Sequence, residues 1–60
     1  MKKSWYVSFV DEEGFTDYVS GRKATCGKEA IRLAKQWLIE SEYKTAEKIA
    51  RCTSWEAEEE

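Results

Sequence analysis

The sequence contains no histidine and no proline, and only two of its 60 residues are cysteines, Cys26 and Cys52. Histidine is the commonest general base and metal ligand in proteins, so its absence argues against acid–base catalysis. A structural zinc site needs four Cys or His ligands, and two cysteines cannot supply them within one chain. The glycines are isolated from one another, so no glycine-rich loop is present to cradle a phosphate. We therefore expect no catalytic, metal-binding or cofactor-binding residues and no enzymatic activity.

Long apolar runs are also missing. After Lys2 and Lys3 the polarity alternates, whereas a signal peptide has about 7–15 consecutive apolar residues. No stretch approaches the roughly 18 apolar residues of a membrane span. The expected compartment is the cytoplasm, with no membrane partner, where Cys26 and Cys52 stay reduced. In an exported protein the same two residues could pair in a single disulfide.

Charge is unevenly distributed along the chain. The 10 basic and 12 acidic residues give a formal net charge of −2. Residues 1–35 hold seven basic and five acidic side chains, and residues 36–60 hold three and seven. The chain ends in EAEEE, residues 56–60. We expect this acidic tail to fray, because its like charges repel one another.

Residues 26–42, CGKEAIRLAKQWLIESE, have the apolar spacing of an amphipathic helix. The apolar stripe consists of Ala30, Ile31, Leu33, Ala34, Trp37 and Leu38. Ile39 points away from this stripe. Thr25 is the better N-cap by residue type, whereas Cys26 has the better spacing to Glu29 for a capping box, and both remain candidates.

Two strands joined by a tight turn are predicted before the helix. Residues 3–11 and 15–24 alternate in polarity and are rich in aromatic and β-branched residues. Between them, Asp11 and Gly14 occupy the first and fourth positions of a type I turn, with Gly14 in the left-handed conformation.

This turn sets a register that gives the hairpin two unlike faces. Phe9 lies opposite Asp17, and Val7 lies opposite Val19. One face carries Trp5, Val7, Phe9, Phe15 and Val19, and the other carries Tyr6, Ser8, Val10, Thr16, Tyr18 and Ser20. The first face is the more apolar and is expected to receive the helix, although Asp17 falls on it. Gly21 permits a bulge in the second strand.

The region after residue 42 fits two patterns. We predict a strand over residues 48–55, because a third strand widens the sheet enough to bury the helix stripe. A second helix over residues 46–52 is the alternative, supported by the helix propensities of Ala, Glu, Lys and Arg.

The predicted fold is a single α+β domain of residues 1–60 with two layers in the order ββαβ. One amphipathic helix packs on one face of an antiparallel sheet, and a hairpin with two helices is the alternative. The expected core consists of Val7, Phe9, Val19, Ile31, Ala34, Leu38 and Ile49.

A chain of this size fits a protein-interaction module better than an enzyme. An ordinary ligand pocket of about 300–1,000 Å³ would take up much of so small an interior. The candidate contacts are side chains left over once the core is filled, namely Tyr6, Val10, Tyr18, Ile39 and Trp55. Exposed aromatic side chains are good interface anchors. By size alone the chain is like the small inhibitors or adaptors that phages and mobile elements direct against host protein complexes. A homodimer through the same rings is the simpler alternative.

Binding to nucleic acid is the second hypothesis. It would use basic residues at the start and on the outer face of the helix, namely Arg22, Lys23, Lys28, Arg32 and Lys35. Against it, a dedicated binder is usually strongly basic, whereas this chain has a net negative charge and Glu29 interrupts the patch. The inverse is an acidic mimic of nucleic acid, in which Glu40, Glu42, Glu47 and residues 56–60 imitate phosphates.

Overall fold

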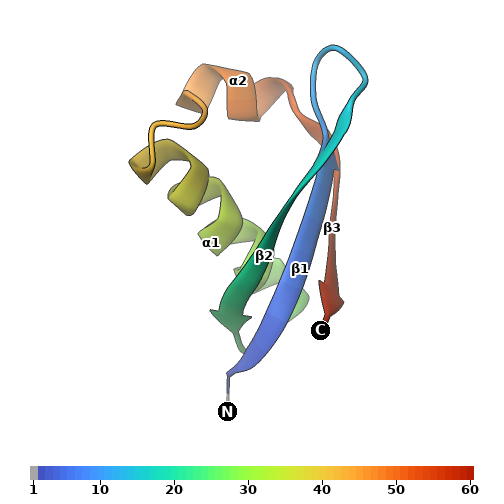
Figure 1. Ribbon diagram of the computed structural model, residues 1–60, viewed down its shortest axis with the longest axis vertical. Helices are drawn as coiled ribbons and strands as arrows, with labels where there is room; N and C mark the ends of the chain where they lie inside the picture. Colours follow the sequence, from blue (N-terminus) through green and yellow to red (C-terminus); the bar gives the residue numbers. More distant parts are fainter. Residues whose placement is uncertain (1) are drawn as a thin grey trace.

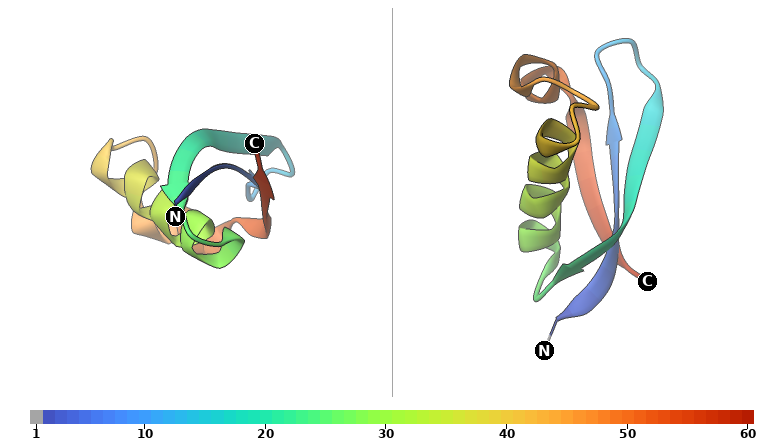
Figure 2. Two further views of the ribbon diagram at one scale, coloured as in Figure 1. Left: turned by 90° about the horizontal axis from the view of Figure 1, so that it is seen from below. Right: turned by 60° about the vertical axis from the view of Figure 1, so that its left-hand side comes forward.

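A three-stranded antiparallel sheet with two helices on one side makes up the computed structural model, which describes residues 2–60 (Figure 1). The elements in chain order are β1 (Lys3–Val10), β2 (Thr16–Ala24), α1 (Gly27–Glu40), α2 (Ala46–Arg51) and β3 (Thr53–Glu59). β1 lies between β2 and β3. The right-hand view of Figure 2 shows both helices on the same side of the sheet. The predicted α+β class is confirmed. Neither helix in this part of the chain has the length and apolar character needed to cross a membrane.

The β1–β2 hairpin has the predicted register. Phe9 pairs with Asp17, and Val7 pairs with Val19. The register shifts on the N-terminal side of Val7, where Gly21 adopts a φ of +73°. This is the predicted bulge, at a residue that reaches positive φ without steric cost.

The turn of the hairpin is organised by the side chain of Asp11. Its carboxylate accepts hydrogen bonds from the backbone N–H groups of Glu13 and Phe15, both at 2.9 Å. Gly14 has a φ of +89°, as predicted. Phe15 lies opposite Asp11, as the register predicts, but the prediction that it contributes to the apolar core side is wrong, because it is 65% exposed. β2 begins only at Thr16, so Phe15 lies at the turn, outside the core cluster.

The region after residue 42 contains both of the predicted alternatives in succession. Thr45 caps α2 by accepting a hydrogen bond from the backbone N–H of Lys48 at 3.2 Å, so a short helix forms where the strand was expected to begin. The strand follows as β3, later than the predicted residues 48–55.

The expectation of a frayed acidic tail is also wrong. Tyr6 pairs with Glu58 and Trp5 with Glu59, so most of residues 56–60 belong to the sheet. An ion pair between Lys3 and Glu59 at 3.3 Å adds to this pairing.

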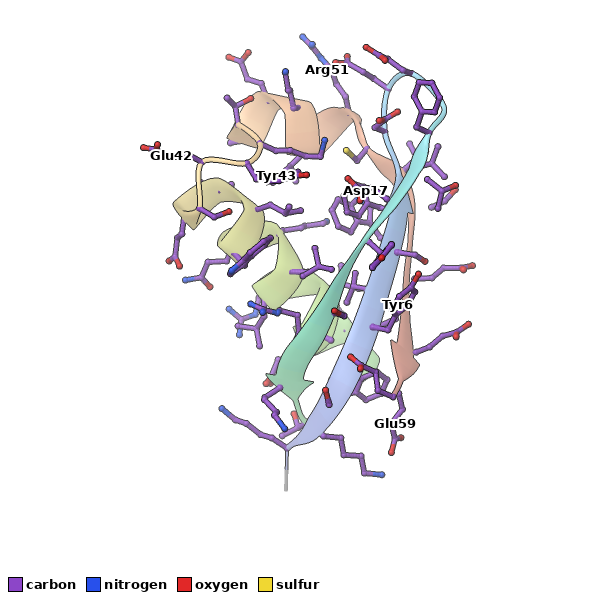
Figure 3. All side chains as sticks on the ribbon, viewed as in Figure 1. Tyr6, Asp17, Glu42, Tyr43, Arg51 and Glu59 are labelled. Carbon is purple, nitrogen blue, oxygen red and sulfur yellow. The ribbon has the colours of Figure 1, made fainter. Side chains whose placement is uncertain are left out.

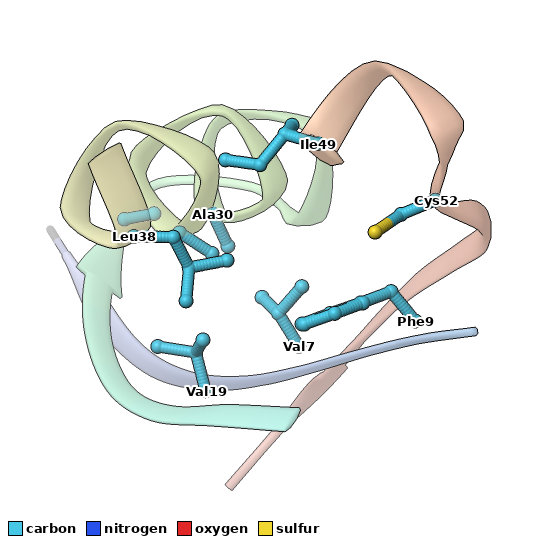
Figure 4. Close-up of a cluster of buried hydrophobic side chains, with 9 residues drawn as sticks. Val7, Phe9, Val19, Ala30, Leu38, Ile49 and Cys52 are labelled. Carbon is cyan, nitrogen blue, oxygen red and sulfur yellow. The ribbon is translucent and has the colours of Figure 1, made fainter. Parts of the chain in front are cut away.

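α1 packs through Ala30, Ala34 and Leu38 on the inner face of the sheet, the face that carries the buried strand residues. The buried core consists of Val7, Phe9, Val19, Ala24, Ala30, Ala34, Leu38, Ile49 and Cys52, most of which are labelled in Figure 4. It includes six of the seven predicted core residues, and Ile31 packs at its margin. Trp37, which was assigned to the buried stripe, is 39% exposed.

Both candidate residues contribute at the start of α1. Cys26 takes the N-cap position, but its side chain makes no capping hydrogen bond. The hydroxyl of Thr25 instead donates to the carboxylate of Glu29 at 3.1 Å.

We predict that Leu38→Ala lowers the free energy of unfolding by about 2–5 kcal/mol, because it removes a buried side chain and leaves a cavity. Leu38 is only 2% exposed. Urea unfolding followed by tryptophan fluorescence measures the change. Ile39→Ala is the matched control at the next position of the helix, where the side chain is 44% exposed, and it should change the stability by less than about 0.5 kcal/mol. Equal losses in the two variants would contradict this packing of α1.

Candidate functional site

The face of the sheet that points away from the helices is uncovered within residues 2–60 (Figure 2). We call it the open face, and it consists of Tyr6, Ser8, Val10, Thr16, Tyr18, Ser20, Glu56 and Glu58. The register places Tyr18 opposite Ser8, and Ser8 opposite Glu56 on the other side. Three of the predicted contact residues, Tyr6, Val10 and Tyr18, therefore share one surface.

Two tyrosines form the apolar centre of the open face. The rings of Tyr6 and Tyr18 are stacked, with centroids 5.1 Å apart and an angle of 22° between their planes. Tyr18 is 58% exposed, and Tyr6, labelled in Figure 3, is half-buried. They meet because they are diagonal neighbours on adjacent strands, which long aromatic side chains can bridge. The stack brings both rings together on one surface of the sheet.

Glu56 and Glu58 give the open face a negative border along β3. They alternate with Trp55 and Ala57, so the two carboxylates point to the open face while the two apolar side chains point to the helices. The ion pairs found among residues 2–60 involve neither carboxylate. Both are therefore available to a positively charged partner.

Glu60 crosses the open face and contacts the bulge in β2. Its carboxylate accepts a hydrogen bond from the backbone N–H of Gly21 at 2.8 Å and another from the hydroxyl of Ser4 at 3.4 Å. An N–H group at a bulge has no ladder partner, and this side chain satisfies it. Glu60 thus serves the fold, unlike Glu56 and Glu58 of β3.

Asp17 satisfies a backbone donor on the outer edge of β2. Hydrogen-bonded and non-hydrogen-bonded pairs alternate along an antiparallel ladder. The N–H of Asp11 donates to the C=O of Phe15, so these two residues form a hydrogen-bonded pair. Counting along the ladder from this pair makes Ser8 and Tyr18 a non-hydrogen-bonded pair. The N–H of Tyr18 therefore points away from β1. That N–H donates to the carboxylate of Asp17 at 2.8 Å. A charged side chain at this place discourages another strand from pairing with β2.

The other two predicted contact residues lie away from the open face. Trp55 packs on the helix side of the sheet, where its ring stacks on Phe9 with centroids 4.4 Å apart. Ile39 is exposed on α1, one turn beyond Lys35 on the same helix stripe. Alternation within β3 explains the position of Trp55, which was predicted as a contact residue because it lies near the end of the chain.

The predicted nucleic-acid-binding residues fall into two groups. Lys28, Arg32 and Lys35 line a shallow hollow of about 500 Å³ along α1. Lys35 is partly engaged, since its Nζ lies 4.8 Å from the centroid of the Trp55 ring. Arg22 and the neighbouring Lys23 line a separate hollow between β2 and α1, so the structure does not bring the five cations together.

A second group of exposed aromatic side chains was not predicted. Trp37 and Tyr43 lie 6.5 Å apart between ring centroids, and the guanidinium of Arg22 lies 5.2 Å from the Trp37 centroid. Tyr43 is 68% exposed and is labelled between the two helices in Figure 3. The position of Trp37 at the margin of the apolar helix stripe is the feature of the sequence that could have indicated its exposure.

The described residues bring together no set of groups that would bind a metal ion. No cluster of three or more His, Cys, Asp or Glu side chains within residues 2–60 has suitable geometry. Cys26 is exposed and Cys52 is buried, and both are free thiols. The thiol of Cys52 donates to the backbone C=O of Lys48 at 3.3 Å.

We predict that Asp17→Val increases self-association, because it frees the outward N–H of Tyr18 and makes the edge of β2 more apolar. Sedimentation velocity over a range of protein concentrations measures the effect. Asp17→Asn is the matched control, since its amide oxygen can still accept the hydrogen bond, and it should behave like the wild type. An Asp17→Val variant with the wild-type sedimentation profile would contradict the protective role of Asp17.

Comparison of the chain with protein-family models, with curated proteins and with solved structures finds no match.

Proposed function

We propose that this protein is a non-enzymatic protein-binding domain that contacts its partner through the open face. The observation that carries the proposal is the stacked pair of the half-buried Tyr6 and the exposed Tyr18 on a sheet face that no helix within residues 2–60 covers. Tyrosine is among the residue types that contribute most to binding at protein interfaces. Uncovered aromatic surface in water otherwise favours nonspecific association.

The contact between the two tyrosines supports the same proposal. Side chains that are ordered before binding lose less conformational entropy when a partner arrives. Tyr6 and Tyr18 are held by each other and by two paired strands, so the open face needs little rearrangement to bind.

The size of the molecule indicates how much of it a partner would cover. A standard interface buries about 800 Å² on each side. The accessible surface of the described residues is 4313 Å², so an interface of that size would cover close to a fifth of it. The partner would then extend beyond the tyrosine pair to Glu56 and Glu58 on β3.

We further propose that the domain acts as an inhibitor or adaptor that covers a surface of its partner, with a host protein complex as the target. The support for this role is the small size of the domain. We place this action in the cytoplasm, where the free thiols of Cys26 and Cys52 would stay reduced.

Nucleic-acid binding through α1 is the second candidate. It is favoured by the single row that Lys28, Arg32 and Lys35 form along the helix. Three phosphate contacts would give a logarithmic salt dependence with a slope of only about −2.7, which is typical of weak binding. The acidic mimic is less favoured, because two carboxylates of the acidic tail are engaged within the fold, Glu59 with Lys3 and Glu60 with Gly21 and Ser4.

We predict that the double substitution Tyr6→Ala and Tyr18→Ala weakens partner binding well beyond tenfold, since each interface anchor contributes about 2 kcal/mol or more. Affinity capture from a lysate of the source cell, followed by mass spectrometry, identifies the partner, and isothermal titration calorimetry then measures the affinity. Circular dichroism checks that the variant keeps its fold.

The matched control removes two cations from α1. Arg32→Ala with Lys35→Ala should retain the captured protein and its affinity, because these side chains lie on the opposite side of the sheet from the tyrosines. Binding of labelled DNA and RNA at several salt concentrations tests the second candidate. A partner that requires the two cations and tolerates loss of both tyrosines would overturn the proposed function.

A further inference from the structure

β3 is an outer strand of the sheet, and no element within residues 2–60 pairs with its outer side. The N–H of Glu60 donates to the C=O of Ser4 at 2.9 Å, which marks a hydrogen-bonded pair with β1. Hydrogen-bonded pairs alternate with non-hydrogen-bonded pairs along the ladder, so Ala57 and Glu59 belong to non-hydrogen-bonded pairs with β1. Their backbone N–H and C=O groups therefore point away from β1. These groups are free to hydrogen-bond to an added strand.

The opposite edge of the sheet differs from this one. On β2, the carboxylate of Asp17 occupies the outward N–H of Tyr18, and the bulge at Gly21 interrupts the strand. A bulge and an inward-facing charge are both features that protect an edge from pairing. Of the two edges, that of β3 is therefore the one open to a partner strand.

The two sides of β3 differ in chemical character. On the open face lie Glu56 and Glu58, which form no ion pair within residues 2–60. On the helix side, β3 borders a shallow hollow of about 540 Å³. Its apolar lining is Ile31, Trp55 and Ala57, and Gly27, Lys28, Glu56 and Glu58 complete the lining. A strand beside β3 would place successive side chains alternately on these two surfaces.

We propose that the outer edge of β3 binds an extended segment of a partner protein in which basic and apolar residues alternate. The basic side chains would face Glu56 and Glu58, and the apolar ones would enter the hollow against Ile31 and Trp55. Backbone hydrogen bonds to Ala57 and Glu59 join the segment to the sheet as a fourth strand. The proposal rests on the proposed protein-binding function and names the part of the partner that is recognised.

The negative charge of β3 selects among strands. β3 of a second copy would bring glutamates opposite glutamates, and like charges directly opposite one another destabilise a strand pair. On the helix side, Lys28 lines the same hollow and disfavours a basic side chain there. Charge thus disfavours self-pairing through β3 and favours an alternating basic segment, so that both repulsion and attraction contribute to specificity.

The test uses a capped six-residue peptide of alternating lysine and valine and the full chain labelled with ¹⁵N. Hydrogen exchange measured by NMR should show slower exchange of the backbone N–H groups of Ala57 and Glu59 at millimolar peptide. The N–H of Tyr18 on β2 should be unaffected. Unchanged exchange at Ala57 and Glu59 would overturn the proposal.

Three control peptides separate the contributions. A peptide with the same composition but with its lysines and valines in separate blocks should bind less well, as should one of alternating glutamate and valine. A lysine–valine peptide with alternate backbone amides methylated cannot form the ladder and should not protect Ala57 or Glu59. Equal binding of the methylated and unmethylated peptides would overturn strand addition.

Charge reversal on β3 provides the sharpest comparison. Glu56→Lys with Glu58→Lys should weaken binding of the lysine–valine peptide by about tenfold or more and should create binding of the glutamate–valine peptide, because the sign of the border is reversed. A variant that keeps the original preference would overturn the charge selection.

The tyrosine variant distinguishes this proposal from the proposed function. With Tyr6→Ala and Tyr18→Ala, the lysine–valine peptide should still protect Ala57 and Glu59. If the captured partner needs the tyrosines but no peptide protects the edge of β3, the domain binds protein through its open face alone and strand addition is wrong.

Discussion

The packing of α1 against the inner face of the sheet is the interaction on which the rest of the structure depends. It is made close by two small side chains, Ala30 and Ala34, and it places Leu38 against the side chains of β1 and β2. Sixty residues provide helices for one side of the sheet only. One consequence of this packing is a stable core on one side, and the other is an aromatic and acidic surface on the side that remains.

The polar residues of the sheet divide into those that the fold uses and those that it leaves to solvent. Asp11 organises the turn, Asp17 occupies an edge donor, and Glu60 satisfies the bulge at Gly21. Each carboxylate accepts a hydrogen bond from a backbone N–H that has no partner in the ladder. This role explains why an acidic residue stands in or beside a strand at these three positions. Glu56 and Glu58 of β3 have no such role and no ion pair within residues 2–60, so their charge is free to act on another molecule.

Local patterns predicted the features that depend on neighbouring residues. Asp11 and Gly14 determine the turn, the turn determines the register, and the register puts Tyr6 and Tyr18 on one face. The acidic border was missed because residues 56–60 were interpreted by their charge, although Trp55 and Ala57 continue a strand alternation through them. Features that depend on distant parts of the chain were harder to predict. The exposure of Trp37, for example, depends on where the margin of α1 lies relative to β2, which helical spacing alone does not specify.

The pairing of β1 with β3 also bears on the order in which the protein folds. Trp5 pairs with Glu59, so this contact closes nearly the whole chain into a loop, whereas the β1–β2 hairpin closes only its short turn. Loop-closure entropy grows with the length of the loop, and contacts between distant residues slow folding. We expect the hairpin and α1 to associate first and β3 to dock last. The strand with the free edge would then also be the first to detach in local opening of the native state.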